Sequence, residues 1–149
     1  MTDDLVWFLI RRRLEDDLIA QQATPGPWSL HWDGQTLQIK HGQGGAVVAE
    51  VTYAIPTYEP EVHEARAECD TRNEEHIARH HPARVLAETE AMGQLLALHH
   101  FEPYEDDPDR GFCRECQRDR AAETYPCTTV RLLALPYADH SDYREEWRP

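Results

Sequence analysis

The chain has 149 residues, of which 40% are hydrophobic and 29% are charged, and its formal net charge is −13. This composition excludes a disordered chain and is typical of a single folded domain, here residues 1–149, with a sizeable core. The acidic excess argues against direct nucleic-acid binding, because duplex binding relies on lysine and arginine side chains at the phosphates.

An apolar run, LVWFLI at residues 5–10, lies near the N-terminus and is followed at once by three arginines. Such a run is much too short to cross a bilayer. A secretory signal, moreover, carries its positive charges before its apolar stretch. We therefore expect a cytoplasmic protein without a membrane partner, in which cysteine thiols stay reduced.

The first predicted element is a helix over residues 2–22. Thr2 is a suitable N-cap, and an apolar stripe recurs at helical spacing at Trp7, Ile10, Leu14 and Leu18. The segment TPGPW ends this helix, because its prolines cannot continue one. Residues 28–54 then have the composition of short antiparallel strands, WSLHW, TLQIK and AVVAEVTYA, separated by glycine-containing turns.

The second half of the chain is predicted to be mainly helical. Residues 55–70 are polar and indicate a loop, and residues 71–99 indicate helices, the longer one starting at Pro82. One stripe of this helix comprises Val85, Thr89, Met92, Leu96 and His99. Residues 101–110 are expected to form an acidic loop.

A short helix is predicted over TTVRLLAL, before Pro136, and opens the last segment, residues 128–149. The tail that follows contains Tyr137, Tyr143 and Trp147, which we expect to strap the core. Together these elements predict an α+β fold with an N-terminal helix, a small antiparallel sheet, a longer helix and a C-terminal zinc knuckle over residues 99–127.

The knuckle is predicted from the segment GFCRECQRDRAAETYPC, which ends in the third of three closely spaced cysteines. Cys113 and Cys116 form a CxxC pair, and Cys127 can close back on it. Zinc favours tetrahedral sulfur and nitrogen ligands, so a fourth donor is needed. The nearest upstream donor on the helix stripe is His99, which makes the predicted ligand set His99, Cys113, Cys116 and Cys127.

Two other residues compete for the fourth ligand position. His100 lies one residue off the stripe, and Cys69 would complete four sulfurs from a distant loop. A set of four protein ligands leaves no open position, so the zinc ion is predicted to be structural. Nearby arginines, namely Arg110, Arg114, Arg118 and Arg120, are expected to lower the thiol pKa values. Reduced cysteines without a metal and a redox CxxC are the remaining interpretations.

A second histidine cluster, NEEHIARHHP at residues 73–82, places His76 and His80 one helical turn apart. This spacing can hold a metal, but Ile77 occupies the position where a hydrolytic HExxH motif has its glutamate. His63, Asp70 and Glu74 are the candidates to complete such a site. Ordinary capping or solvent exposure of the histidines is the alternative.

Several motifs resemble a family of small proteins of unknown function from actinobacteria and their phages. These motifs are TPGPW, HIARHHPARVL, the CxxC…YPC segment and RLLALPYADHSDYREEW. The first half is also similar to a wider group of small phage accessory proteins. The resemblance implies this origin and ligand roles for His99 and the three cysteines. The sequence departs from the family pattern at His81, where an acidic cap is common, and at Ser141, where proline is common.

The sequence carries no Walker loop, nucleophile elbow or dinucleotide fingerprint. We therefore expect a small acidic zinc-binding protein of unknown specific activity that acts as a non-catalytic binding or adaptor protein toward a protein partner or a small ligand. One alternative is a metal-dependent hydrolase that uses His76 and His80. Another is an acidic DNA mimic or a sponge for a nucleotide signal. The oligomeric state is left open.

Overall fold

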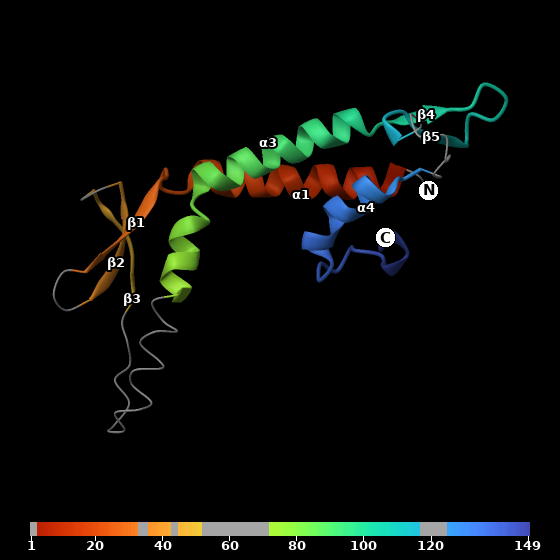
Figure 1. Ribbon diagram of the computed structural model, residues 1–149. Coiled ribbons are helices and arrows are strands. Elements are labelled where there is room, and N and C mark those ends of the chain that lie inside the picture. Colours follow the sequence, from red (N-terminus) through yellow and green to blue (C-terminus); the bar gives the residue numbers. More distant parts are fainter. Residues whose placement is uncertain (1–2, 33–35, 43–44, 52–71, 117–124) are drawn as a thin grey trace. The chain divides into compact units, whose positions relative to one another are not determined.

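The computed structural model describes residues 3–32, 36–42, 45–51, 72–116 and 125–149. The chain divides into two compact units, which are Met1–Asp17 with Glu88–Pro149 (unit 1) and Leu18–Ala87 (unit 2). Helices α1 (Asp3–Gln22) and α3 (Pro82–Leu98) each run through parts of both (Figure 1). Over the described ranges, none of the helices combines the length and the apolar character that crossing a membrane requires.

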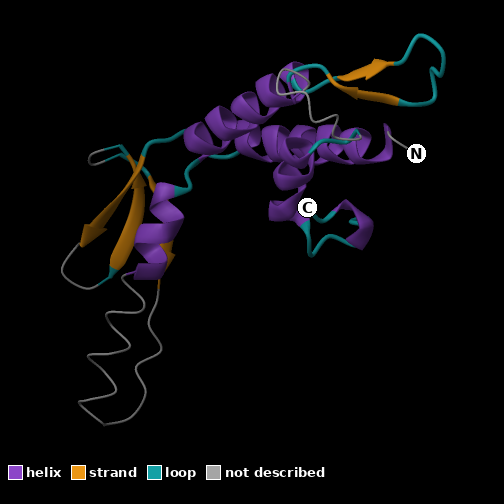
Figure 2. Ribbon diagram, turned by 45° about the vertical axis from the view of Figure 1, so that its right-hand side comes forward, coloured by secondary structure: helices purple, strands orange, loops and turns teal. Residues whose placement is uncertain are grey.

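Unit 2 contains the predicted antiparallel sheet. Its strands are β1 (Trp28–Trp32), β2 (Leu37–His41) and β3 (Val47–Val51), in the order β1-β2-β3. The buried Ile39 at the centre of β2 pairs with Leu30 on one side and Ala49 on the other. A helical segment over 72–79 lies beside these strands (Figure 2) and buries Ala78. The predicted loop 55–70 lies outside the described residues, as does Thr2.

Helix α1 forms where it was predicted, and the face that it buries differs from the apolar stripe noted in the sequence. The covered side chains of its first turns are those of Leu5, Phe8, Leu9 and Arg12, whereas Trp7 is 62% exposed and Leu14 53% exposed. Both sets have helical spacing, because residues 5–10 are apolar all around the helix. The buried face includes Arg12, which contacts the His140 ring and donates a hydrogen bond to Glu15. The spacing of apolar residues alone does not predict that a face containing an arginine is buried.

Helix α3 carries the predicted stripe, whose side chains are buried or partly buried. Thr89 is buried and donates a hydrogen bond to Asp17, while Val85, Met92, Leu96 and His99 are partly covered. The helix ends at Leu98, and the backbone amide of His99 still bonds to the carbonyl of Leu95. The last residue of the stripe is therefore held at the end of the helix with its orientation fixed.

The predicted acidic loop at 101–110 is wrong at its beginning, and residues 104–110 form the loop. Residues Phe101–Pro103 form β4, which pairs antiparallel with β5, Gly111–Cys113. Gly111 faces Pro103 across the hairpin, and a Cβ atom there would collide with the carbonyl oxygen of Glu102 and the ring of Phe101. The strands are too short for an alternating pattern to show, and acidic and proline residues dominate the composition between them.

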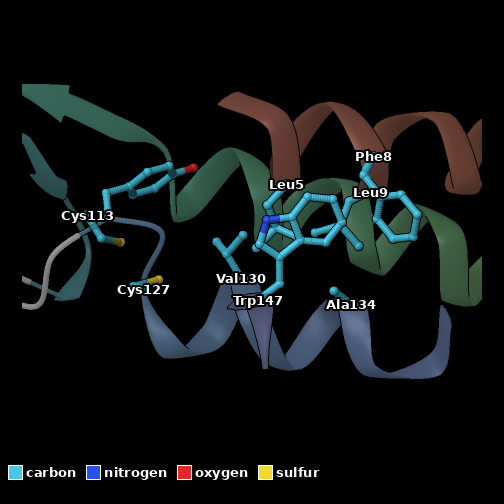
Figure 3. Packing of buried hydrophobic residues seen from close by; sticks show 9 residues of the cluster. Leu5, Phe8, Leu9, Cys113, Cys127, Val130, Ala134 and Trp147 are labelled. Atoms are coloured by element: carbon cyan, nitrogen blue, oxygen red, sulfur yellow. The ribbon is translucent and has the colours of Figure 1, made fainter. Parts of the chain in front are cut away.

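The C-terminal segment, which is itself part of unit 1, packs against α1 as an aromatic strap, as predicted. It consists of α4 (Thr128–Ala134), η2 (Leu135–Tyr137) and η3 (Glu145–Trp147). The Phe8 ring of α1 lies 6.2 Å from the rings of Tyr137 and Tyr143 and 5.1 Å from that of Trp147, between centroids. Phe8 and Trp147 belong to one buried cluster that also contains Cys113 and Cys127 (Figure 3), and Tyr137 and Tyr143 pack against it.

Candidate metal centre

Four elements of unit 1 bring the predicted ligand side chains to one place. His99 follows α3 directly, and Cys113 is the last residue of β5. Cys116 lies in the turn after β5, and Cys127 occupies the N-cap position of α4 in an extended conformation. The β4–β5 hairpin turns the chain back toward the end of α3, which brings the CxxC pair to the histidine.

The ligand atoms of these four residues all lie within 4.8 Å of one another, in the single such group of three or more potential ligands among the described residues. The Nδ1 atom of His99 lies 3.4 Å from the Sγ atom of Cys113, 3.5 Å from that of Cys116 and 3.7 Å from that of Cys127. A neutral imidazole nitrogen has one proton or one lone pair, so it cannot form three hydrogen bonds at once. The arrangement is instead that of four donors around a common centre.

The spacing of these atoms fits a tetrahedral metal ion. Zinc–sulfur bonds near 2.3 Å and zinc–nitrogen bonds near 2.05 Å, set at the tetrahedral angle, place sulfur and nitrogen ligands about 3.6 Å apart. The three observed separations between the His99 nitrogen and the sulfurs, 3.4 to 3.7 Å, bracket this value. The four side chains are thus close enough to hold a metal ion without rearrangement.

The thiols of the cluster are enclosed. Cys113 is 1% exposed and Cys127 is fully buried. Burial, together with hydrogen bonds and charges from the other two thiols, raises the pKa of Cys116 to about 12, and burial also raises the pKa of Cys127. Without a cation the thiols of Cys116 and Cys127 therefore keep their protons, and metal binding must release them.

Of the arginines expected to lower the thiol pKa values, the structure describes Arg110 and Arg114, and neither is among the main causes that act on the pKa of Cys116 or Cys127. Arg114 is exposed and forms a salt bridge of 3.0 Å with Glu102, which neutralises its charge. The expected lowering of thiol pKa values is wrong for Cys116 and Cys127, whose pKa values are raised, with burial as the main cause. Arg118 and Arg120 lie outside the described residues.

The neighbouring His100 points away from the cluster. Its Nδ1 atom lies 3.0 Å from the carbonyl oxygen of Ala97, and its Nε2 atom lies 2.9 Å from a carboxylate oxygen of Glu102. The hydrogen bond to Glu102 is the main cause that raises the pKa of His100. Both ring nitrogens are thus engaged elsewhere, so the structure brings His99 and not His100 to the cysteines. Cys69, the third candidate, lies outside the described residues.

The second histidine cluster does not form a comparable group. The rings of His76 and His80 lie 4.1 Å apart between centroids, both are exposed, and the Nδ1 atom of His80 bonds to the carbonyl oxygen of His76. Within the described part of the chain, no third potential ligand joins them. His63 and Asp70, which the hydrolase interpretation would use, lie outside that part.

One element that forms part of the site was not predicted from the sequence. The β4–β5 hairpin positions Cys113 and also supplies Glu102, which holds His100 away. The aromatic residues Phe101 and Phe112 and the glycine at 111 were the available signals, because aromatic residues favour strands and a glycine permits close backbone approach.

The fold and the cluster define a small α+β protein with a possible His/Cys₃ metal site near its C-terminus. A model of a family of unknown function, DUF6221, matches residues 2–149. The chain therefore belongs to this family. No curated protein and no solved structure matches it.

Proposed function

We propose that the protein is a non-catalytic binding or adaptor protein whose C-terminal segment is held in place by one structural zinc ion. The ligands are His99, Cys113, Cys116 and Cys127. The observation that carries the proposal is the closed ligand set. One nitrogen and three sulfurs at tetrahedral spacing, two of them fully or almost fully buried, leave no position for a substrate or an activated water.

Zinc is the metal that best suits this donor set. Thiolate and imidazole ligands in tetrahedral array select zinc over magnesium, calcium and manganese, which prefer oxygen ligands. Bound there, the ion supplies a cross-link and a positive charge that stabilises the thiolates. Cys127 begins α4 and His99 follows α3, so the site ties the end of one helix to the start of another.

The role of a binding protein is supported by the same features and by the motif content of the sequence. A cross-linked core that holds a C-terminal strap stabilises a surface, and no catalytic motif accompanies it. The partner is proposed to be a protein or a small ligand in the cytoplasm. An origin in actinobacteria or their phages is supported by the resemblance of the sequence motifs.

The test is the metal content of matched variants, measured by native mass spectrometry and elemental analysis of the purified protein. We expect one zinc ion per wild-type chain, and its loss in Cys113→Ser. His100→Ala is the matched control, because His100 lies beside the ligand His99 but bonds to Glu102. This variant should keep its zinc.

Cobalt substitution adds an independent readout of the ligand set. A tetrahedral site with three thiolates should give intense visible ligand-field bands with a sulfur-to-cobalt charge-transfer band, both absent in Cys113→Ser. A wild-type protein purified and folded without metal would contradict the proposal. A second metal lost on His80→Ala would instead favour the hydrolase.

A further inference from the structure

A groove in unit 1 lies between the first turns of α1 and the C-terminal tail. It encloses about 480 Å³, which is within the size range of small-molecule sites. Helix α1 contributes one face, with successive side chains at helical spacing, namely Asp4, Trp7, Phe8, Arg11 and Arg12. The opposite wall is formed by the tail, with Tyr143, Arg144 and Trp147. The metal centre contributes no residue to this lining.

Aromatic rings form the apolar part of the groove. The Phe8 and Trp147 rings lie 5.1 Å apart, and the Tyr143 ring lies 5.7 Å from that of Trp147 in an edge-to-face arrangement. Trp147 is buried, and this wall is fixed because its rings belong to or pack against the core of unit 1 (Figure 3). Trp7, in contrast, presents most of its indole to solvent and offers a free ring face for stacking.

The lining of the groove holds more arginines than aspartates, although the chain as a whole is strongly acidic. Among its described lining residues are three arginines and two aspartates. Arg144 is paired with Asp4 at 2.9 Å and lies over the Trp147 ring, which accounts for its charge. Arg11 is exposed, and within the described ranges it forms no ion pair. Its guanidinium is therefore available to an anion, and it lies one helical turn from the exposed Trp7.

Two buried donors of the groove residues lack partners. Arg12 is only 7% exposed, and its Nε atom has no hydrogen-bond partner among the described residues, although its Nη2 atom donates to Glu15. The hydroxyl group of Tyr143 is buried and likewise unsatisfied there. Unsatisfied buried polar groups are uncommon in folded proteins. Both atoms are covered by neighbouring protein atoms, so a ligand in the groove does not reach them, and Arg11 is the arginine of the lining, unpaired among the described residues, that a ligand can contact.

We propose that this groove binds a small organic anion that carries a flat aromatic ring, with the anion at Arg11 and the ring stacked on Trp7. The inference names the ligand class of the proposed binding protein and rests on that proposal. A nucleoside monophosphate and an aromatic carboxylate share this chemistry. The same arrangement, a stacking ring beside an arginine, recurs where proteins bind phosphorylated bases.

The test is calorimetric titration of the full-length, metal-loaded protein with adenosine 5′-monophosphate, and separately with indole-3-acetate. Adenosine and inorganic phosphate serve as half-ligands, and each should bind at least tenfold more weakly than the monophosphate. Arg11→Ala should weaken binding about tenfold, because it removes one charge-assisted hydrogen bond. Arg110→Ala is the matched control: Arg110 is also exposed but lies outside the groove, and its replacement should leave the affinity unchanged.

Trp7→Ala should also weaken binding about tenfold through the loss of stacking. Trp32→Ala is its control, because Trp32 is exposed to a similar extent but belongs to β1. Binding of either aromatic anion, weakened by both groove variants, supports the inference and identifies the source of the anion. Absence of binding by both anions, or affinities that the two groove variants leave unchanged, overturns it.

Two further measurements separate this inference from the proposed function. Arg11→Ala and Trp7→Ala should retain one zinc ion per chain, so a failure of ligand binding with zinc intact refutes the groove alone. Chromatography of the ligand after incubation should recover it unchanged. Recovery of a hydrolysed product would confirm a site in the groove but contradict a non-catalytic function.

Discussion

Two adjacent histidines show how hydrogen-bond partners decide which side chain can join the candidate metal centre. His99 and His100 have the same side chain and lie within one turn of the end of α3, yet only His99 meets the three sulfurs. The difference arises from their partners. Glu102 and the carbonyl of Ala97 take both ring nitrogens of His100, which leaves no lone pair for a metal.

Tyr137 links the C-terminal strap to α1 and should make stability depend on alkaline pH. Its hydroxyl group donates a 2.7 Å hydrogen bond to Asp16. Burial, followed by this hydrogen bond and the charge of Asp16, raises the pKa of Tyr137 above its ordinary value near 10. The folded state therefore holds the phenolic proton more tightly than the unfolded state does.

A raised pKa in the folded state contributes stability that is complete below about pH 10 and is lost as the pH rises further. At neutral pH, Tyr137→Phe should lower the free energy of unfolding by about 1 kcal/mol. Above pH 10 the difference between wild type and variant should shrink. Urea unfolding at several pH values, with tyrosinate absorbance at 295 nm, measures this, and a constant difference up to pH 12 would contradict it.

At the scale of the elements, α1 shows which of two apolar stripes the fold buries. Leu5, Phe8 and Leu9 enter the core cluster, while Trp7 and Leu14 lie on the exposed side. Arg12 shares the buried face and covers Phe8 with its guanidinium, 5.6 Å from the ring centroid. A cation above an aromatic ring is therefore part of the packing that selects this face.

Two leucines of α1 provide a direct test of that face. Leu9→Ala should lower the free energy of unfolding by about 2–5 kcal/mol, because Leu9 is fully buried and its removal leaves a cavity. Leu14→Ala should change it by less than about 0.5 kcal/mol, because Leu14 is half exposed. Chemical denaturation of both variants measures the effect. Equal losses, or a larger loss for Leu14→Ala, would contradict the buried face that the structure shows.

The same comparison shows what could be predicted from the sequence. Strands β1, β2 and β3 and the stripe from Val85 to His99 could be predicted, because β-type composition and helical periodicity are properties of the local sequence. The end of the predicted strand region, residues 52–54, lies outside the described residues. The ligand set followed from the CxxC spacing and from His99 lying on that stripe. The buried face of α1 and the β4–β5 hairpin were not readable. The buried face of α1 depends on the contact of Arg12 with His140, which is distant in the sequence. The hairpin depends on pairing between two three-residue strands on either side of an acidic loop.

At the scale of the whole molecule, the candidate metal centre and the core of unit 1 are one structure. Cys113 and Cys127 belong to the buried cluster that contains Leu5, Leu9 and Val130 (Figure 3). Loss of a metal there would leave unsatisfied thiols inside an apolar core and release the start of α4. The ion should therefore stabilise the packing of unit 1, and its removal should act well beyond the four ligands.

Metal removal should consequently affect unit 1 more than unit 2. We expect a strong zinc chelator to lower the stability of unit 1 by at least about 3 kcal/mol, since bound metal stabilises only the folded state. Hydrogen exchange followed by mass spectrometry should show lost protection in α4 and the first turns of α1, while β2 around Ile39 keeps its protection. Cys113→Ser is the control, and chelator should add nothing to its exchange pattern. Equal loss in both units would show that the chain unfolds as the single domain predicted from its sequence, and unchanged protection everywhere would refute a structural metal.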